Sequence, residues 1–564
     1  MRTRARITTI ATPSISSRLA ASVTMAGAWP LAKNALLPLA LLLVALGLRI
    51  YRLEAMAWVP DTYERLEDTR RILAGQLPHS TLYPPGVSVL MALPAAVFGA
   101  SLLTMQAVTI MLGAALVLLA YFGTLRLTGD RLAAALLAGG VAVSPYFVYS
   151  SRSGLYDIVI AFFVAGSVFL LPALRGRGVV AFVAYGALLA LLLGIRPTAA
   201  VLLPILLIYW LCLFDTRLDA RRIAAALVTP NVLATAAAVV LLTGALVLGG
   251  NWLGRAGGAP VTLERFDRNL GYYAQFLVQA PVGVFLLVPP ACFGAVRLRR
   301  TNRPLLWTIG LILVSWPLLH APFYYASLRY MLTPFFFVLV LAAVGWSHIL
   351  QSRPLRPTGL CRAARLYGAA AFVLFTAYNL LATGYVLHET PRIAAESDAG
   401  LARELSPVLA DLRPGALVVS AVSRAFRDQE GHVEFLDLID TSLAIRDEAR
   451  RTELTTARME QALGEGRDVY YLYSHWEAGE DFQGDGREGY QRYFDAAAAE
   501  FALTEIFRTE RGRQGKHPWI LFKVERRTGR IRDASAGRVL SLGRPSLIDN
   551  ATLGDQRGRV VGFW

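Results

Sequence analysis

The stretch that decides the fold covers residues 34–86 and reads NALLPLALLLVALGLRIYRLEAMAWVPDTYERLEDTRRILAGQLPHSTLYPPG. It begins with an apolar run over 34–52 that is long enough to cross a bilayer, which takes roughly 20 residues. An acidic loop follows this run, and a Pro-Pro-Gly sequence then leads into further apolar residues. The order predicts a membrane span followed by a loop that carries charged groups at the membrane surface.

Similar apolar runs recur along most of the chain. Of its 564 residues, 55% are hydrophobic and 17% are charged, whereas a soluble globular protein usually carries about 25% charged residues. This composition excludes a disordered chain and argues against an ordinary soluble enzyme. We therefore predict a polytopic α-helical membrane protein with about eleven transmembrane helices. The expected spans lie near residues 34–52, 102–122, 131–149, 157–173, 178–194, 197–214, 226–250, 280–296, 305–324, 330–350 and 367–387.

Basic residues mark one side of these spans. When the N-terminal extension, residues 1–33, is placed in the cytoplasm, five basic loops fall on that same side, as the positive-inside rule requires. Gly86–Ala100 is apolar but only fifteen residues long and contains Pro94, so we expect an interfacial or re-entrant helix on the outer face. The five loops hold Arg126/Arg131, Arg175/Arg177, Arg217/Arg221/Arg222, Arg297/Arg299/Arg300/Arg303 and Arg353/Arg356/Arg362/Arg365.

The segment 389–564 differs from the rest in composition. It holds 29 of the 40 acidic residues and 25 of the 56 basic ones. The positive excess therefore lies in the membrane part, where it follows from topology, and it does not indicate a nucleic-acid partner. Strand-like runs at 416–421, 469–473 and 519–524 and a helical stretch at 490–501 predict a soluble α/β domain. Eleven spans place this domain outside, in the periplasm, with the spans in a bacterial inner membrane.

Charged residues gather on the outer side of the predicted transmembrane domain, residues 34–388. Eight of its eleven acids lie in loops assigned to that side, most of them in loop 53–101. Shorter outer loops place single charges at span ends, namely Arg152 with Asp157, Arg196, and Arg329. Ionisable groups near the bilayer are costly and, when present, usually line a cavity or pathway. We therefore expect the chemistry on the outer face, with 53–101 as the catalytic loop.

Short motifs follow one another in a fixed order on this outer side. They are Pro60-Asp61-Thr62-Tyr63 with Gly75 and Tyr83-Pro84-Pro85-Gly86, then Ser151–Asp157, Gly194-Ile195-Arg196-Pro197-Thr198, and Leu328–Pro334. In this order the chain resembles the GT-C membrane glycosyltransferases, especially the branch of the protein O-mannosyltransferases and the lipid A aminoarabinose transferases. It departs from that family at Thr62, where the family often has a second acid. It also lacks the Trp-Trp-Asp signature of oligosaccharyltransferases.

The resemblance implies an inverting sugar transfer from a polyprenyl-phosphate donor in the membrane to a lipid, glycan or protein acceptor. Such a reaction needs a carboxylate to take the acceptor proton and cations to hold the leaving phosphate. Asp61 is then the general base, and arginine suits the phosphate because its planar fork binds two oxygens. The candidates for binding the donor phosphate and sugar are Arg152, Asp157, Arg196, Arg329, Tyr330, Tyr83, Glu67 and Asp68.

Each of these residues also has a structural interpretation. Asp61 could cap the helix of the first outer loop, the arginines could anchor span ends, and Glu67 and Asp68 could face solvent. No Cys or His spacing predicts a zinc site, and no cofactor follows from the sequence. A divalent metal at Asp61 stays an option, because some GT-C enzymes depend on one.

Two other functions compete with sugar transfer. The first is a transporter or lipid flippase of the cell envelope, although such proteins often consist of pseudo-symmetric halves with broken helices and this sequence has no internal repeat. The second is a non-catalytic relative whose outer domain serves as a scaffold in envelope assembly.

Overall fold

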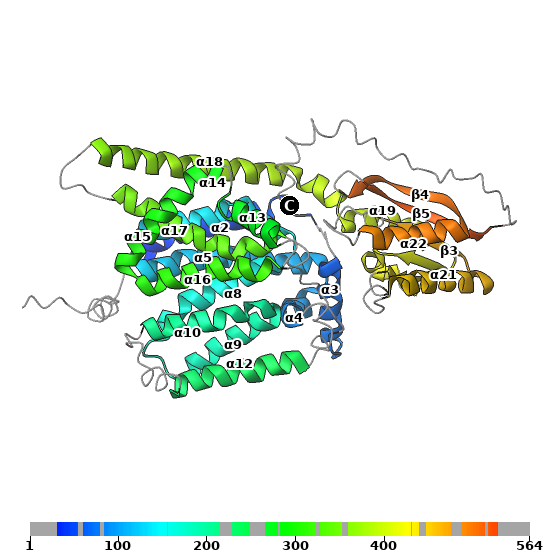
Figure 1. Ribbon diagram of the computed structural model, residues 1–564, viewed down its shortest axis with the longest axis horizontal. Coiled ribbons are helices and arrows are strands. Elements are labelled where there is room, and N and C mark those ends of the chain that lie inside the picture. Colours follow the sequence, from blue (N-terminus) through cyan, green and yellow to red (C-terminus); the bar gives the residue numbers. More distant parts are fainter. Residues whose placement is uncertain are drawn as a thin grey trace, which may run out of the picture.

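The computed structural model consists of a helical bundle and a smaller sheet domain, which lie side by side along the longest axis (Figure 1). The bundle is formed within residues 31–395 and the sheet domain within residues 398–527. The structure describes residues 31–54, 60–78, 84–154, 156–213, 228–248, 266–279, 282–322, 327–351, 359–429, 431–438, 441, 447–474, 487–513 and 517–527.

The helices of the bundle follow the predicted apolar runs. The first half contains α2 (Leu31–Ile50), α3 (Pro60–Leu73), α4 (Gly86–Phe98), α5 (Leu102–Thr128), α6 (Arg131–Val143), α7 (Pro145–Arg152), α8 (Asp157–Leu170), η1 (Leu171–Leu174), α9 (Val179–Ile195), η2 (Pro197–Val201) and α10 (Leu202–Leu213). The second half contains α12 (Pro230–Leu248), α13 (Phe266–Leu277), α14 (Val282–Leu286), α15 (Val288–Thr301), α16 (Arg303–His320), η5 (Leu328–Met331), α17 (Leu332–Gln351) and α18 (Gly359–Ala395).

Five helical stretches of the described residues are long and apolar enough to cross a membrane. A sixth is the pair α6 and α7, which bends by 52° at Ser144 because Pro145 follows. Other apolar helices, such as α9 and α12, are shorter than the usual span. The chain is therefore a multi-pass membrane protein, and the total of eleven spans stays a prediction.

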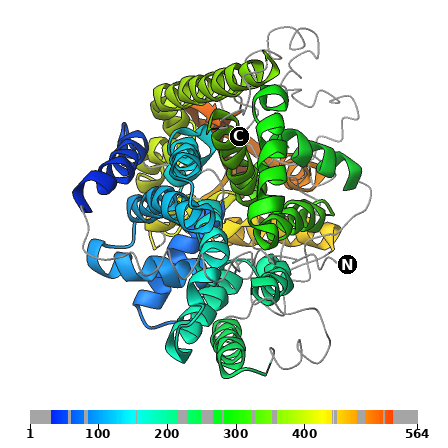
Figure 2. The ribbon, with the colours of Figure 1, turned by 90° about the vertical axis from the view of Figure 1, so that its left-hand side faces the viewer.

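The core of the bundle lies around α17. In the most apolar stretch of this helix 83% of the residues are buried, and Phe335 and Phe336 pack against Phe147 of α7. Peripheral helices instead expose large apolar side chains, such as Val180 at 83% and Leu381 at 76%. Figure 2 views the bundle from the end opposite the sheet, with these helices on its periphery. An extensive apolar exterior of this kind is typical of a protein embedded in lipid.

The two ends of the bundle carry different loops. At one end Asp130, which caps α6, accepts hydrogen bonds from Ser347 and Gln351 of α17, and Asn302 bonds to the end of α5. The helix ends that bear Arg152, Asp157 and Arg196 lie at the other end, next to the sheet domain. Loops that the sequence assigns to opposite sides of a membrane thus lie at opposite ends of the bundle.

The sheet domain has five strands in the order β2-β1-β3-β5-β4. The pairs β1–β2 and β1–β3 are parallel, and β3–β5 and β4–β5 are antiparallel. Its helices pack on both faces: α19 and η6 on one, α21 and α22 on the other. The elements are α19 (Asp398–Ala410), β1 (Leu417–Ser420), η6 (Ser423–Gln429), β2 (Glu434–Asp437), α21 (Glu448–Gly464), β3 (Val469–Tyr473), α22 (Arg487–Glu500), β4 (Phe501–Arg513) and β5 (His517–Arg526).

Side chains along the central strands point alternately to the two faces of the sheet, so both faces are apolar. In β1, Val418 contributes to the core beneath α19, while Leu417 and Val419 contribute to the core beneath α21 and α22. Tyr470 and Tyr471 of β3 divide between the two cores in the same way.

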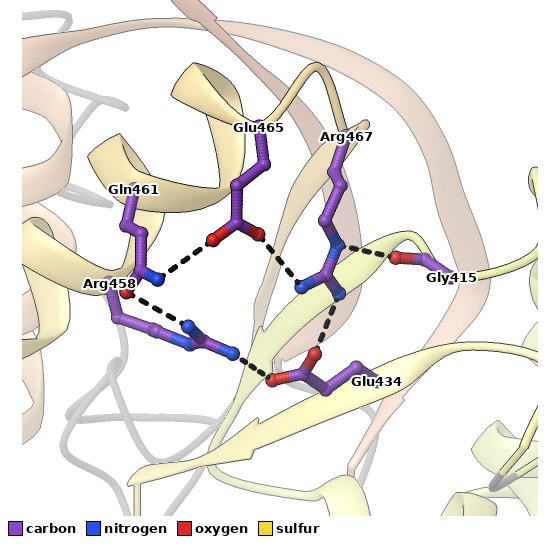
Figure 3. A network of polar contacts seen from close by, with 6 residues as sticks. All are labelled: Gly415, Glu434, Arg458, Gln461, Glu465 and Arg467. Atoms are coloured by element: carbon purple, nitrogen blue, oxygen red, sulfur yellow. Dashed lines mark hydrogen bonds and ion pairs between the residues drawn. The ribbon is translucent and has the colours of Figure 1, made fainter.

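An ion-pair network fixes one edge of this domain (Figure 3). Glu434 of β2 accepts from Arg458 of α21 and pairs with Arg467, each at 2.7 Å, and Arg467 also donates to the carbonyl of Gly415. The hydrogen bond from Arg458 is the main reason why the pKa of Glu434 lies below its usual value, and Arg467 adds to it. The network joins α21 to β2 and to the loop before β1.

Candidate active site

Three predicted site residues meet at the end of the bundle nearest the sheet. Asp157, whose side chain is 2% exposed, pairs through Oδ1 with Nη1 of Arg196 at 3.3 Å. Its Oδ2 lies 3.9 Å from Nε of Arg329. These residues come from three separate connections of the chain, and the structure brings them together around one carboxylate. We call Asp157, Arg196, Arg329 and Tyr330 the arginine cluster.

The local sequence positions the three charged residues of the cluster. Asp157 is the first residue of α8, where the helix dipole favours an acid. Arg196 ends α9 in an extended conformation (φ −148°), because Pro197 disfavours the helical conformation in the residue before it. Arg329 lies in the short η5 turn that leads into α17. All three side chains therefore project from helix ends.

Aromatic rings line the cluster. The guanidinium carbon of Arg196 lies 4.2 Å from the centre of the Tyr330 ring, and that of Arg329 lies 5.4 Å from it. Arg329 also approaches the Tyr156 ring at 6.0 Å. Trp316 holds the Tyr330 backbone by donating its indole N–H to the carbonyl at 2.9 Å. The ring faces stabilise the two cations.

Helix α3, which follows the first span, borders this cluster. Figure 1 shows it across the end of the bundle that faces the sheet domain. Arg65 of α3 lies 4.9 Å from the centre of the Tyr156 ring and donates to the carbonyl of Pro84 at 2.7 Å. Asp61 lies in the first turn of this helix, four residues before Arg65, and the positions i and i+4 share one face of a helix.

The remaining predicted residues of the first outer loop have different positions. Asp68 is 1% exposed, so it does not face solvent, whereas Glu67 is half-buried. Thr62 stands where the GT-C family often has a second acid. Its side chain is 3% exposed and lies near Gly154. Tyr83 lies outside the described residues, as does the side chain of Asp61.

Arg152 lies apart from the cluster. Its Nη1 donates to the carbonyls of Arg49 and Tyr51 at 2.8 and 2.6 Å, and its Nη2 donates to that of Arg52 at 2.8 Å. A further bond reaches Thr390 of α18. These carbonyls belong to the end of α2, where a helix has no backbone partners left. The contacts of Arg152 favour a structural role as the cap of the first span.

Close packing of α4 on α9 sets the position of Arg196. Gly86, at the start of α4, lies against the backbone of Gly194, and a methyl group on Gly86 would come within 2.7 Å of the amide nitrogen of Ile195. Arg196 follows directly, so the distance between the two helices determines where its side chain begins.

A Gly86→Ala substitution should therefore push α4 away from α9. We expect a loss of about 1–3 kcal/mol of stability, because the new methyl group meets backbone that cannot rotate away. Thermal unfolding of the detergent-solubilised protein measures the effect. Gly139→Ala in α6 is the matched control, because nothing lies within 4 Å of the added methyl group. Equal stability of the two variants would contradict the tight contact.

A cleft of about 790 Å³ opens near this end, between the ends of α2 and α18 and strand β4. Its lining includes Arg52, whose carbonyl accepts from Arg152, and Arg392, which pairs with Glu389 and Glu396. The cleft thus borders the Arg152 cap rather than the arginine cluster. We assign it no catalytic role.

The chemistry of the arginine cluster follows from its charges. One buried carboxylate faces two arginines whose side chains are 11% and 15% exposed, and Arg65 adds a third cation beside Tyr156. Guanidinium groups gathered at one helix-end surface suit an anionic oxygen ligand such as a phosphate. Among the described residues no group of three or more His, Cys, Asp or Glu side chains could hold a metal ion.

Sequence reasoning missed Arg65 and Tyr156. Arg65 lies among several other charges of the first outer loop, and nothing in the spacing distinguishes it from a solvated helix face. Tyr156 directly precedes Asp157, and its position next to a candidate site residue is the feature of the sequence that could have identified it.

Comparisons with known proteins agree with this fold. Residues 83–248, which include Asp157 and Arg196, match the model of a family described as dolichyl-phosphate-mannose-protein mannosyltransferase. The structure of ArnT from Cupriavidus metallidurans bound to undecaprenyl phosphate is 13% identical, with a TM-score of 0.53 over 90% of this chain and 98% of that one. The apo structure of that protein gives a TM-score of 0.52 over 87% and 97%, again at 13% identity.

A third solved structure is more distant. The arabinofuranosyltransferase AftD from Mycobacteria is 12% identical, with a TM-score of 0.48 over 87% of this chain and 40% of that one. No curated protein matches the sequence.

The structure shares the fold of ArnT, which is the fold type of the GT-C membrane glycosyltransferases. The match of residues 83–248 to the mannosyltransferase family confirms the resemblance inferred from the order of the motifs.

Proposed function

We propose that the protein transfers a sugar from a polyprenyl-phosphate donor to a lipid, glycan or protein acceptor on the outer face of a bacterial inner membrane. The observation that carries this proposal is the arginine cluster, where two largely buried arginines lie against one carboxylate and against the ring of Tyr330. A lipid phosphate is the anion that such a site at the end of a membrane bundle would meet. ArnT, which shares the fold, binds undecaprenyl phosphate.

The reaction in this proposal is a single displacement. The acceptor hydroxyl oxygen bonds to the anomeric carbon as the bond from that carbon to the phosphate oxygen breaks, so the configuration inverts. Asp61 takes the hydroxyl proton as general base. Arg196 and Arg329 hold the phosphate as it leaves with the bonding electron pair and gains negative charge. Asp157 keeps both arginines in place by pairing with each of them.

Further residues serve this step in supporting roles. We assign Tyr330 to hold the guanidinium groups through its ring, at 4.2 and 5.4 Å. Arg65, Tyr83, Glu67 and Asp68 are proposed to shape the donor site from the first outer loop, and Arg152 to fix the span that precedes that loop. A metal at Asp61 is not required for this step.

The competing transporter or flippase has less support. A transport path needs ionisable groups at mid-depth. Among the described residues, the fully buried charged side chains of the bundle are Arg49, Glu64, Arg65, Arg152, Asp68, Asp157 and His320. All of them lie in α3 or at helix ends on the side of the sheet domain. One-sided charge favours chemistry at one membrane face.

Deletion of the gene, followed by mass spectrometry of envelope lipids and glycans, tests the proposal in the cell. We expect one sugar to disappear from one class of acceptor and the intact polyprenyl-phosphate donor to accumulate. A chromosomal Asp61→Asn allele should reproduce both changes. A deletion strain that keeps every sugar modification would contradict the proposal.

A further inference from the structure

The sheet domain contacts the bundle through a buried charged group. Arg424, in η6, is 6% exposed, and its Nη1 lies 3.4 Å from Oε2 of Glu64 in α3. Its Nε lies 3.5 Å from Oδ2 of Asp437 at the end of β2. Ser423 donates to the same Asp437 oxygen at 2.5 Å. One arginine therefore joins a helix of the first outer loop to two elements of the sheet domain.

Burial strengthens the electrostatic interaction of Arg424 with its two acidic partners. The side chains of Glu64 and Asp437 are 9% and 14% exposed, so water does little to screen the charges. Removing one partner of a buried ion pair costs more than removing one partner of an exposed pair does, because the charge that loses this pairing stays out of water. The position of α3 is therefore tied to the position of η6.

The contact lies within one helical turn of the proposed catalytic groups. Glu64 is three residues after Asp61 and directly before Arg65, which packs on Tyr156 beside the arginine cluster. Arg65 and Glu64 thus fix the same turn of α3 from two sides, one on the bundle and one on the sheet domain. A shift of this turn moves the first turn of the helix, where Asp61 lies.

We propose that Arg424 is a positioning residue, through which the sheet domain holds α3 in the geometry that sugar transfer requires. This inference rests on the proposed function, because it assigns the base to Asp61. The sheet domain then takes part in catalysis without touching the donor, and its docking on α3 controls the catalytic rate.

The test compares Glu64→Gln, Arg424→Gln and the double variant in the full-length protein. A misplacement of about 1 Å can cost roughly 100-fold in rate, so we expect each single variant to lose about 10- to 100-fold in kcat. The KM for the polyprenyl-phosphate sugar should change less than kcat does, because the arginine cluster that binds the phosphate is intact. The double variant should lose no more activity than the single variants, because each of the three already breaks the contact between Glu64 and Arg424.

Hydrogen exchange gives a second readout. Amides of residues 60–73 should exchange faster in both single variants, while those of β1 and β3 stay protected. Arg458→Gln is the matched control, because it breaks an ion pair with Glu434 on the same strand, β2, within the sheet domain (Figure 3). The control should keep wild-type kcat and wild-type exchange in α3.

The outcomes separate this inference from the proposed function. Wild-type kcat in well-folded Glu64→Gln and Arg424→Gln, beside an inactive Asp61→Asn, would overturn the positioning role alone. Losses that multiply in the double variant would also overturn it. If Arg424→Gln fails to fold, Glu64→Gln decides, because it leaves the Arg424–Asp437 pair within the sheet domain in place. Full activity of Asp61→Asn would instead refute the proposed function.

Discussion

Asp61→Asn should abolish nearly all sugar transfer while the protein folds normally. Asparagine has the size of aspartate but cannot accept the proton of the acceptor hydroxyl, and loss of a general base costs roughly 10²- to 10⁴-fold in rate. We expect the loss in kcat, with donor affinity unchanged, because the arginine cluster binds the phosphate independently. Initial rates with saturating polyprenyl-phosphate sugar measure it.

A matched control distinguishes this role from helix capping. Asp267→Asn removes an exposed acid from the first turn of α13, so it tests the effect of losing a carboxylate at a helix start. We expect it to retain wild-type kcat. If Asp61 only caps α3, Asp61→Asn should also retain activity, because asparagine caps a helix as well as aspartate does.

Arg329→Gln should produce the second large effect. Arg329 lies 3.9 Å from Asp157 and faces two tyrosine rings, and we propose that it stabilises the charge of the leaving phosphate. Removal of one preorganised donor of this kind costs roughly 10²- to 10³-fold in kcat. Donor binding should also weaken, because the phosphate is already anionic before the reaction. Steady-state kinetics and equilibrium binding of polyprenyl phosphate measure the two effects.

Arg329→Lys separates phosphate binding from membrane anchoring. Lysine can anchor a span end as arginine does, but it cannot bind two oxygens with a planar fork. We expect Arg329→Lys to stay well below wild-type activity. Arg126→Gln, an exposed arginine at the opposite end of the bundle, should have no effect. Full recovery in Arg329→Lys would assign Arg329 to anchoring.

The meeting of Asp157, Arg196, Arg329 and Tyr330 was accessible from the sequence. Each residue lies at the outer end of its predicted span. In a helical bundle, residues at the same end share a narrow surface. The alternation of basic loops predicted on which side of the membrane each loop lies. The order of the motifs indicated the resemblance to the GT-C glycosyltransferases. Distances and ion pairs needed the structure, because they depend on how the helices cross.

The role of Arg152 was not accessible in this way. Its motif, an arginine followed by an acid at a span start, makes Arg152 a candidate for binding the donor phosphate. The unpaired carbonyls at the end of α2 attract the guanidinium instead. Asp157 pairs with arginines from two other loops. Whether the guanidinium binds carbonyl groups or a carboxylate depends on how the helices are placed relative to one another. The hydrophobic periodicity of the sequence does not predict this placement.

The link between Glu64 and Arg424 lay equally beyond sequence reasoning. The two residues are far apart in the chain, and each has charged neighbours that predict a solvated surface. Their burial follows from the docking of η6 on α3. The bend at Ser144 likewise divides one apolar run into α6 and α7, which length alone would count as one straight span.

Purified protein in liposomes that contain a labelled polyprenyl-phosphate sugar tests the central claim most directly. With an acceptor-containing envelope extract outside, we expect one free polyprenyl phosphate for each sugar that appears on the acceptor, and none with Asp61→Asn. Passage of the intact donor across the bilayer, without release of free polyprenyl phosphate, would contradict sugar transfer by this protein.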